Sequence, residues 1–253
     1  MPQTILGIIP ARFASSRFPG KALVPIAGKS ILQHVFERAS LSRCLSRVII
    51  ATDDERISQE ARRFGAPVRM TRSDHPSGTD RAAEVASTHP HEIVVNIQGD
   101  EPLIDPAAID AAVLALIDDP DSPMSTLKKR IEVPEEITNP NVVKVVTDRF
   151  GRAICFSRSP IPYARAGSPA YFKHIGLYVY RREFLLGYPR LPVGPLERAE
   201  CLEQMRALEN GFPIRVAETE YESLGVDTPE DLERVAQLFE ASSRTPIRER
   251  EGL

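Results

Sequence analysis

Blocks of apolar residues separated by polar, turn-forming residues run along the first half of the chain. Four short blocks rich in β-branched residues predict buried parallel strands at 5–9, 47–53, 68–70 and 92–97. Apolar residues at helical spacing predict helices at 31–39, 55–64, 81–88 and 106–117. Ser30 and Asp54 are the predicted N-caps of the first two helices. This alternation indicates βαβ units and a parallel sheet.

The second half of the chain has more predicted strands and fewer helices. Strands are predicted at 124–127, 142–147, 152–157, 173–181 and 214–217, with a hairpin across 145–154. One helix is predicted over 195–210, ended by Gly211. A last helix begins at Pro229 with Thr228 as its N-cap, which leaves Asp227 to point elsewhere.

Composition narrows the class of protein. The 253 residues fit one large α/β domain or two small ones, and 42% hydrophobic with 26% charged residues is an ordinary globular balance. A formal net charge of -3 argues against a nucleic-acid or membrane partner held by bulk attraction. The three cysteines are scattered, so neither a zinc site nor a disulfide framework is predicted. With no signal-peptide pattern and no apolar stretch of transmembrane length, a cytoplasmic protein is expected.

The loop after the first strand carries three cations, Arg12, Arg17 and Lys21. Ligands of open α/β sheets lie outside the carboxyl ends of the strands, so this loop is placed to hold a multiply charged anion such as a nucleoside triphosphate. The alternative is a solvated surface loop. It is not a Walker A loop, because Leu23 stands where that motif requires glycine. Nor does a G-x-G-x-x-G follow this strand, which argues against a dinucleotide fold.

Two other strand ends deliver carboxylates. Asp100 follows the strand at 92–97, with Gly99 beside it to allow close approach, and this position suits a Mg²⁺ ligand. The alternative for a lone aspartate in a tight turn is a capping role. Asp53 ends the strand at 47–53, where it can touch a ribose or cap the next helix, and capping is the favoured reading.

The loop at 71–81 is dense in small and hydrogen-bonding residues. Gly78 permits close approach of the backbone to a planar base. A helix-capping turn, with Ser77 or Thr79 as the cap, explains the same residues equally well.

Taken together, seven blocks resemble the 3-deoxy-manno-octulosonate (Kdo) cytidylyltransferase family, the CMP-Kdo synthetases. The blocks are IPARFASSRFPGK at 9–21, MTR at 70–72 with SGT at 77–79, NIQGDEP at 96–102, FSR at 156–158, KHIGLY at 173–178, LEQ at 202–204 and GVDTPEDL at 225–232. The resemblance extends from about residue 4 to about residue 238. Asp80 and Phe13 stand where the family often has Glu and Tyr, and both substitutions preserve charge or ring.

The resemblance implies an α/β fold with a mixed, mostly parallel sheet flanked by helices, similar to nucleotide-diphosphosugar transferases, and an added β portion for dimerisation. It implies one domain over 1–241, with a nucleotide-binding half at about 1–123, a sugar-binding and dimerisation portion at about 124–241, and a flexible tail at 242–253. A homodimer is the expected assembly.

The implied reaction is CTP plus Kdo giving CMP-Kdo and pyrophosphate for lipopolysaccharide biosynthesis, with Mg²⁺ as cofactor. The family pattern implies that Arg12 and Lys21 hold the triphosphate and that Asp100 and Asp227 bind magnesium. It implies that Gln98 lies between nucleotide and sugar, and that the residues beside the nucleotide are Arg72, Ser77, Gly78 and Thr79. The residues that it implies for the sugar pocket are Arg158, His174, Tyr178, Glu203 and Gln204. Arg12, Lys21, Asp100 and Asp227 are the expected catalytic residues.

The sequence leaves four alternatives to this function. Within the same reaction class, the 8-amino analogue of Kdo and a sialic acid are alternative sugars, and the blocks at 156–158 and 173–178 favour Kdo over sialate. A nicotinamide-dependent oxidoreductase is disfavoured by the missing glycine motif. A non-catalytic nucleotide-binding regulator is disfavoured by the presence of both Asp100 and Asp227. A nucleic-acid-binding module is disfavoured by the net charge.

Overall fold

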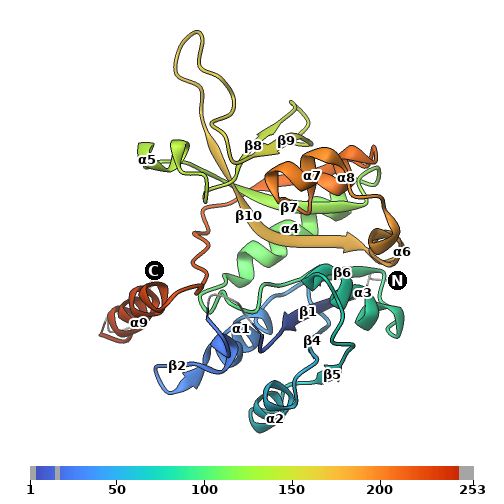
Figure 1. Ribbon diagram of the computed structural model, residues 1–253, viewed down its shortest axis with the longest axis vertical. Coiled ribbons are helices and arrows are strands. Elements are labelled where there is room, and N and C mark those ends of the chain that lie inside the picture. The colour runs from blue at the N-terminus through green and yellow to red at the C-terminus, as the bar shows by residue number, and fades with distance from the viewer. Residues whose placement is uncertain (1–3, 15–17, 245–253) are drawn as a thin grey trace, which may run out of the picture.

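The computed structural model describes residues 4–14 and 18–244, so Arg17 and residues 245–253 of the predicted tail lie outside it. A mixed sheet of nine strands crosses the described part of the chain (Figure 1). Its strands are β1 (Ile5–Ala11), β4 (Arg47–Thr52), β5 (Val68–Met70), β6 (Ile93–Asn96), β7 (Met124–Arg130), β8 (Lys144–Thr147), β9 (Ala153–Ser157), β10 (Phe172–Arg181) and β11 (Ile214–Glu218). A separate hairpin joins β2 (Pro25–Ile26) to β3 (Lys29–Ser30).

The order of strands along the sheet is β11-β7-β10-β6-β1-β4-β5, and β8 joins it through β10. The neighbours β6, β1, β4 and β5 are parallel, as the alternation of strands and helices predicts. β10 is antiparallel to both β6 and β7, and it connects this parallel half to the parallel pair β7–β11. The predicted mixed, mostly parallel sheet is therefore confirmed.

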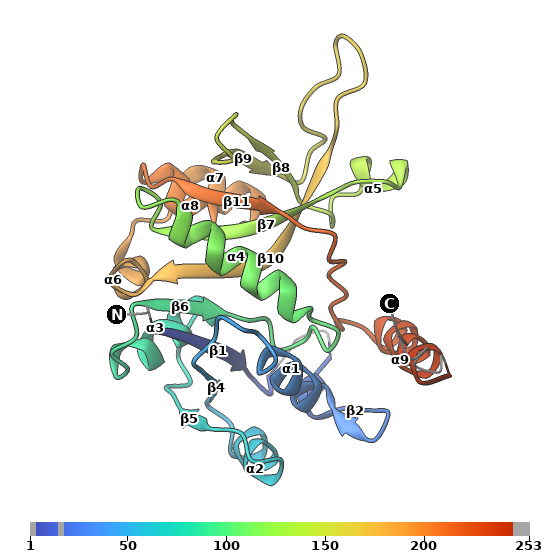
Figure 2. The same cartoon turned by 180° about the vertical axis from the view of Figure 1, so that it is seen from behind.

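Helices cover both faces of the sheet. They are α1 (Ile31–Ala39), α2 (Glu55–Arg63), α3 (Gly78–Ser87), α4 (Pro106–Asp118), α5 (Pro134–Thr138), α6 (Arg182–Gly187), α7 (Pro195–Glu200), α8 (Met205–Glu209) and α9 (Pro229–Arg244), with 3-10 turns η1 (Lys21–Leu23) and η2 (Tyr188–Arg190). Apolar residues of α1, α2 and α4 form the core on one face, and those of α3, α6 and α8 form the core on the other (Figures 1 and 2). Within the described ranges, each helix is too short or too polar to cross a membrane.

Several helix starts follow the predicted capping chemistry. Ser30 Oγ accepts from Gln33 N at 3.2 Å, and Asp54 Oδ1 accepts from Arg56 N at 2.9 Å. Thr228 Oγ1 accepts from Asp231 N at 3.2 Å at the start of α9. Each cap satisfies a backbone donor that the first turn leaves without a partner.

Two predicted helices differ in the structure. The helix predicted to start at residue 81 begins three residues earlier, at Gly78, because Ser77 Oγ caps it by accepting from Asp80 N. The helix predicted over 195–210 is broken into α7 and α8, since Cys201 takes a left-handed conformation with φ 52°. The break buries Leu202. It also brings Glu203 into a hydrogen bond with Ser77, and Gln204 into a hydrogen bond with Tyr178 on β10. The short helices α5 and α6 were not predicted.

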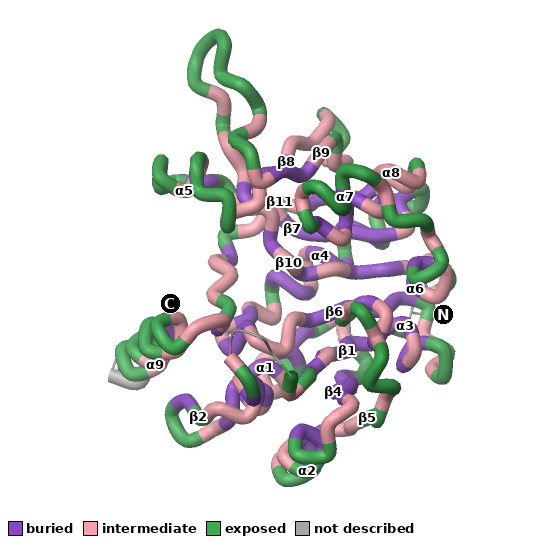
Figure 3. Tube along the Cα trace, viewed as in Figure 1, coloured by how far each residue is buried: buried purple, intermediate pink, exposed green. Residues whose placement is uncertain are grey.

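The segment between β9 and β10 projects from the body of the molecule as a long loop, and most of it is exposed (Figure 3). Tyr163 in this loop is 87% exposed, and Ile154 on the neighbouring β9 is 63% exposed.

Candidate functional site

A cavity of about 330 Å³ opens at the carboxyl ends of β1 and β6. Its lining residues are Pro10, Ala11, Arg12, Lys21, Ala22, His75, Pro76, Ser77, Gly78, Arg81, Asn96, Gln98, Gly99, Asp100 and Asp227. They come from the end of β1, from η1, from the start of α3 and the loop before it, from the end of β6 and the turn that follows, and from Asp227, two residues before α9. Gly99 packs so closely on β1 that a Cβ there would lie 2.8 Å from the backbone oxygen of Pro10. The glycine is therefore required for the close approach that the sequence suggested.

One lysine joins two carboxylates in this cavity. Lys21 Nζ lies 2.5 Å from Asp100 Oδ2 and 2.8 Å from Asp227 Oδ1. Burial alone would lower the pKa of Lys21, but its charge interactions and hydrogen bonds with Asp100 and Asp227 outweigh burial, so the pKa is raised. The side chain is therefore a permanent cation at neutral pH.

The turn that carries Asp100 is tied to the segment that carries Asp227. The Val226 backbone N–H donates to the Asp100 carbonyl oxygen at 2.9 Å. Glu101 is buried and accepts from the Tyr221 hydroxyl at 2.8 Å and from the Ser223 hydroxyl at 2.7 Å. Burial raises the pKa of Glu101 to about 7. This carboxyl group fixes the two segments together and, with them, the spacing of the two aspartates.

The chemistry of this pair suits a divalent cation. Two carboxylates already share one cation, and a hard ion such as Mg²⁺ uses one or two carboxylates with phosphate oxygens and water as its remaining ligands. Among the residues that the structure describes, no group of three or more His, Cys, Asp or Glu side chains could form an all-protein metal site. The residues present therefore fit a metal that binds together with a polyphosphate.

The residues expected near the nucleotide divide into two groups. Arg12, Lys21, Ser77, Gly78 and Gln98 line the cavity. Arg72 does not: its Nε donates to Asp74 at 2.9 Å, and its side chain is 69% exposed. Thr79 does not either: its side chain is buried and accepts from Asn96 Nδ2 at 3.4 Å. A nucleotide role for these two residues stays a prediction.

Three polar lining residues are not among the predicted site residues, namely His75, Arg81 and Asn96. Arg81 is buried and pairs with Asp53 at 3.1 Å, so Asp53 neither caps α2 nor lines the cavity. Asn96 Oδ1 is buried with no hydrogen-bond partner among the described residues. Asn96 itself lies in the block at 96–102, and His75 and Arg81 lie within two residues of the block at 77–79, which was the available signal.

A second cavity, of about 670 Å³, adjoins the first. The five residues expected in the sugar pocket all line it, and they are Arg158, His174, Tyr178, Glu203 and Gln204. Gln98 and Asp227 line both cavities. A group bound in one cavity therefore meets a group bound in the other at these two side chains.

Hydrogen bonds orient the residues of the second cavity. The Tyr178 hydroxyl donates to Gln204 Oε1 at 3.2 Å, and His174 Nε2 lies 2.9 Å from the Thr126 hydroxyl. Burial lowers the pKa of His174 to about 3, so the ring is neutral at pH 7. Arg158 donates from Nε to the Glu200 carbonyl at 2.8 Å and from Nη1 to the Pro140 carbonyl at 2.9 Å.

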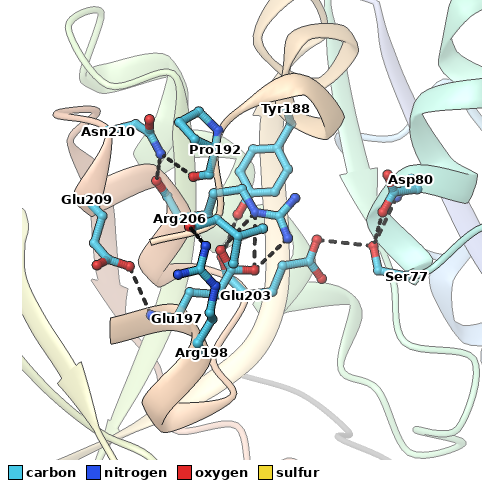
Figure 4. Close-up of polar contacts among 11 residues, drawn as sticks. Ser77, Asp80, Tyr188, Pro192, Glu197, Arg198, Glu203, Arg206, Glu209 and Asn210 are labelled. Atoms are coloured by element: carbon cyan, nitrogen blue, oxygen red, sulfur yellow. Dashed lines mark hydrogen bonds and ion pairs between the residues drawn. The ribbon is translucent and has the colours of Figure 1, made fainter. Parts of the chain in front are cut away.

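Glu203 connects the two halves of the site (Figure 4). Its Oε1 accepts from the Ser77 hydroxyl at 3.1 Å, and its backbone oxygen accepts from the Tyr188 hydroxyl at 2.7 Å. Burial raises the pKa of Glu203, while hydrogen bonds from Thr79 and Ser77 oppose the shift. A residue of the second cavity is thereby held by the loop that begins α3.

The segment bearing Glu203 is braced by charge pairs. Arg206 Nε and Nη2 contact both oxygens of Glu197, and Arg206 also lies over the Tyr188 ring at 5.2 Å (Figure 4). Glu209 accepts from the Leu196 and Glu197 backbone N–H groups at the start of α7. These contacts hold α7 against α8 across the break between them.

Comparison with known proteins agrees with this geometry. A family model described as "Cytidylyltransferase" matches residues 6–223. The 3-deoxy-manno-octulosonate cytidylyltransferase of Solibacter usitatus is 70% identical over 244 residues, which cover 96% of this chain and 97% of that protein. The solved structure of a CMP:2-keto-3-deoxy-manno-octonic acid synthetase complexed with CTP superposes with a TM-score of 0.91 at 43% identity, covering 95% of this chain and 100% of the other.

A more distant structure shares the fold alone. The 4-diphosphocytidyl-2C-methyl-D-erythritol synthase of Anaerococcus prevotii superposes with a TM-score of 0.62 at 13% identity, covering 95% of this chain and 100% of that chain. The full-length similarity at high identity is decisive for the family. The chain belongs to the 3-deoxy-manno-octulosonate cytidylyltransferase family.

Proposed function

We propose that this enzyme transfers the cytidylyl group of CTP to Kdo and releases pyrophosphate. The observation that carries the proposal is the junction of the two cavities at Gln98 and Asp227. A triphosphate in the cationic cavity and an acidic sugar in the other would meet at that junction, as a bimolecular transfer requires. The family membership and the relatives named above support the same pair of substrates.

The polar residues of the first cavity suit the demands of in-line attack at the α-phosphorus. Catalysis of phosphoryl transfer consists mainly of positioning and of stabilising the negative charge on the phosphate oxygens. We assign Arg12 and Lys21 to the triphosphate and the leaving pyrophosphate. We assign Asp100 and Asp227 to Mg²⁺, which when bound neutralises phosphate charge and lowers the pKa of the attacking anomeric hydroxyl. No side chain is then needed as a dedicated base.

The second cavity offers a partner for the carboxylate of the sugar. The guanidinium of Arg158 uses two of its five N–H groups on backbone carbonyls, which orients its plane. The planar guanidinium suits a carboxylate better than the ammonium of a lysine would, because its N–H groups match the two carboxylate oxygens. Tyr178, Gln204 and the neutral His174 offer hydrogen bonds to the sugar hydroxyls.

The test is pyrophosphate release with CTP and Mg²⁺, comparing Kdo, the 8-amino analogue of Kdo and a sialic acid, with EDTA as control. Release with Kdo that EDTA abolishes is the expected result. Release with the 8-amino sugar alone would support the proposed mechanism but show that the enzyme is specific for the 8-amino sugar and not for Kdo. Silence with all three sugars, while CTP still binds, would refute the catalytic proposal and leave a nucleotide-binding protein.

Asp227 lies where the attacking group would approach, because it lines both cavities. We therefore expect Asp227→Asn to lower turnover far more than it weakens CTP binding. Steady-state kinetics and a separate CTP titration measure the two effects, with Asp121→Asn, in an exposed turn, as the control. Equal losses in turnover and CTP affinity would contradict this role for Asp227.

We further propose a cytoplasmic homodimer in which the β8–β9 hairpin and the projecting loop contact the partner. The exposed apolar side chains Ile154 and Tyr163 support this surface. Light scattering of the wild type and of Ile154→Asp tests it: a dimer that becomes a monomer is expected, and a monomeric wild type would refute it.

The functional division into halves at 1–123 and 124–241 stays a prediction, and Asp227 of the second half also lines the first cavity.

A further inference from the structure

The ammonium of Lys21 lies where a cation shared by Asp100 and Asp227 would lie. The nitrogen is within 2.8 Å of an oxygen of each carboxylate, and the Lys21 side chain is only 16% exposed. The two aspartates are 79 and 206 positions away from Lys21 in the sequence, so this contact is a product of the tertiary structure. It also brings together three residues that the proposed reaction uses separately, a phosphate-binding lysine and two metal ligands.

Two carboxylates this close to one another need a cation between them. Each carboxylate repels the other, and water screens this repulsion weakly because the pair is partly buried, at 27% and 38% exposure. In the ligand-free protein Lys21 supplies the positive charge. A divalent cation bound by the same oxygens would compete with the ammonium for them.

We propose that the ammonium of Lys21 occupies the metal position between Asp100 and Asp227 in the ligand-free enzyme. When CTP and the metal bind together, the ammonium moves from the two carboxylates to the triphosphate. This inference rests on the proposed function. The metal then binds well only with the nucleotide, because only the nucleotide offers Lys21 new anionic partners. The triphosphate also supplies oxygens that complete the coordination of the metal, which two carboxylates alone leave incomplete.

The surroundings of Lys21 suit such a transfer. It begins η1, a single 3-10 turn, directly after Gly20, whose positive φ of 73° sets the start of that turn. The side chain is a flexible four-carbon stem with an ammonium that can change partners. Arg12 and the start of α3 line the same cavity, so a triphosphate held there lies within reach of Lys21 without movement of the sheet.

A thermodynamic consequence follows from the competition. If CTP removes Lys21 from the carboxylates, CTP raises the affinity for the metal, and the metal must raise the affinity for CTP by the same factor. The two ligands are thereby made to bind as one unit.

The test is calorimetric titration of Mg²⁺ into the nucleotide-free enzyme, for the wild type, Lys21→Met and Lys29→Met. Lys29 is the control, because it forms a surface pair with Glu37 at 2.6 Å. Lys21→Met is expected to bind Mg²⁺ at least about tenfold more tightly than the wild type, a typical size for coupling between ligands. Lys29→Met should match the wild type. Adding Asp100→Asn to Lys21→Met should remove the gain and so locate the metal.

The outcomes separate this inference from the proposed function. In one outcome, CTP gives the wild type a metal affinity that depends on Asp100, but Lys21→Met without CTP binds Mg²⁺ no more tightly than the wild type does. The inference about Lys21 is then wrong, while the proposed metal site is supported. If neither protein binds Mg²⁺ through Asp100 even with CTP, the proposed metal site fails.

A measurement on the wild type covers the case in which Lys21→Met does not fold. The ¹⁵N resonance of the Lys21 ammonium should move when CTP and Mg²⁺ are added together. A shift of the same size with Mg²⁺ alone would overturn the inference.

Discussion

Replacing Arg206 by methionine should destabilise the protein by more than the loss of one ordinary ion pair. Arg206 and Glu197 are 13% and 10% exposed at their side chains, and they are joined by contacts of 2.5, 2.9 and 3.1 Å. Methionine keeps much of the volume of the arginine stem but leaves the Glu197 carboxylate buried without its cation. Breaking a buried pair in this way costs about 3–5 kcal/mol, whereas an exposed pair contributes at most about 1 kcal/mol.

The assay is urea unfolding at pH 7, followed by circular dichroism, on the wild type, Arg206→Met and the double variant Arg206→Met with Glu197→Leu. The double variant should recover most of the loss, because replacing both partners of a buried pair by apolar residues is often neutral. A loss below about 1 kcal/mol for the single variant would refute the burial argument. A double variant as unstable as the single one would show that the packing of Arg206, and not its charge, is what matters.

The same variant should affect the two substrates differently. Arg206 lies over the Tyr188 ring, and the Tyr188 hydroxyl holds the backbone oxygen of Glu203 in the second cavity. Loosening this contact should raise the KM for the sugar more than it raises the KM for CTP. Steady-state kinetics with each substrate varied in turn measures the difference.

Two further predictions concern a close backbone approach and a pH effect. Gly99→Ala should weaken CTP binding, because the added Cβ would lie 2.8 Å from the Pro10 backbone oxygen. A CTP titration measures the effect, with Gly225→Ala as the control because no atom lies within 4 Å of its Cβ. Equal CTP affinities of the two variants would contradict the prediction. Arg152 lowers the pKa of Asp119 to about 2, so the stabilisation is present above the ordinary value of 3.8 and is lost as pH falls toward 2. Arg152→Met should therefore lower the free energy of unfolding in urea at pH 7 and lower it much less near pH 2, and a loss that does not depend on pH would contradict the linkage.

Most of the parallel half of the fold could be predicted from local sequence. The strands at 5–9, 47–53, 68–70 and 92–97 are short β-branched runs, and the structure has β1, β4, β5 and β6 there. Caps at Ser30, Asp54 and Thr228 follow from side-chain chemistry that acts over two or three residues. Such local signals do not depend on the rest of the chain.

The break between α7 and α8 could not be predicted, because its cause is tertiary. Residues 195–210 contain good helix formers and no internal glycine. The chain leaves the helix at Cys201 because burying Leu202 and bonding Glu203 to Ser77 stabilise the break. Local propensity contains no information on a partner 126 positions away.

The site shows a similar division. Lys21, Asp100 and Asp227 belong to three separate motifs of the sequence, and the fold brings them into one cluster. Arg72 and Thr79 are neighbours of lining residues in the sequence, yet their side chains contact Asp74 and Asn96 instead. Sequence proximity to a motif thus identifies the segment but not the direction of each side chain.

The long sequence separation of that cluster bears on how the protein is made. The bond from Lys21 to Asp227 joins residues 206 positions apart, so it can form only after the ribosome has synthesised the segment that carries Asp227. The parallel half can fold much earlier, because the strands that pair around β1 are complete by residue 96. A nascent or prematurely terminated chain would therefore hold a folded cationic cavity that lacks the second aspartate. Catalytic competence would arise only after the segment that carries Asp227 has been synthesised, so chains that stop before it could bind nucleotide without consuming it.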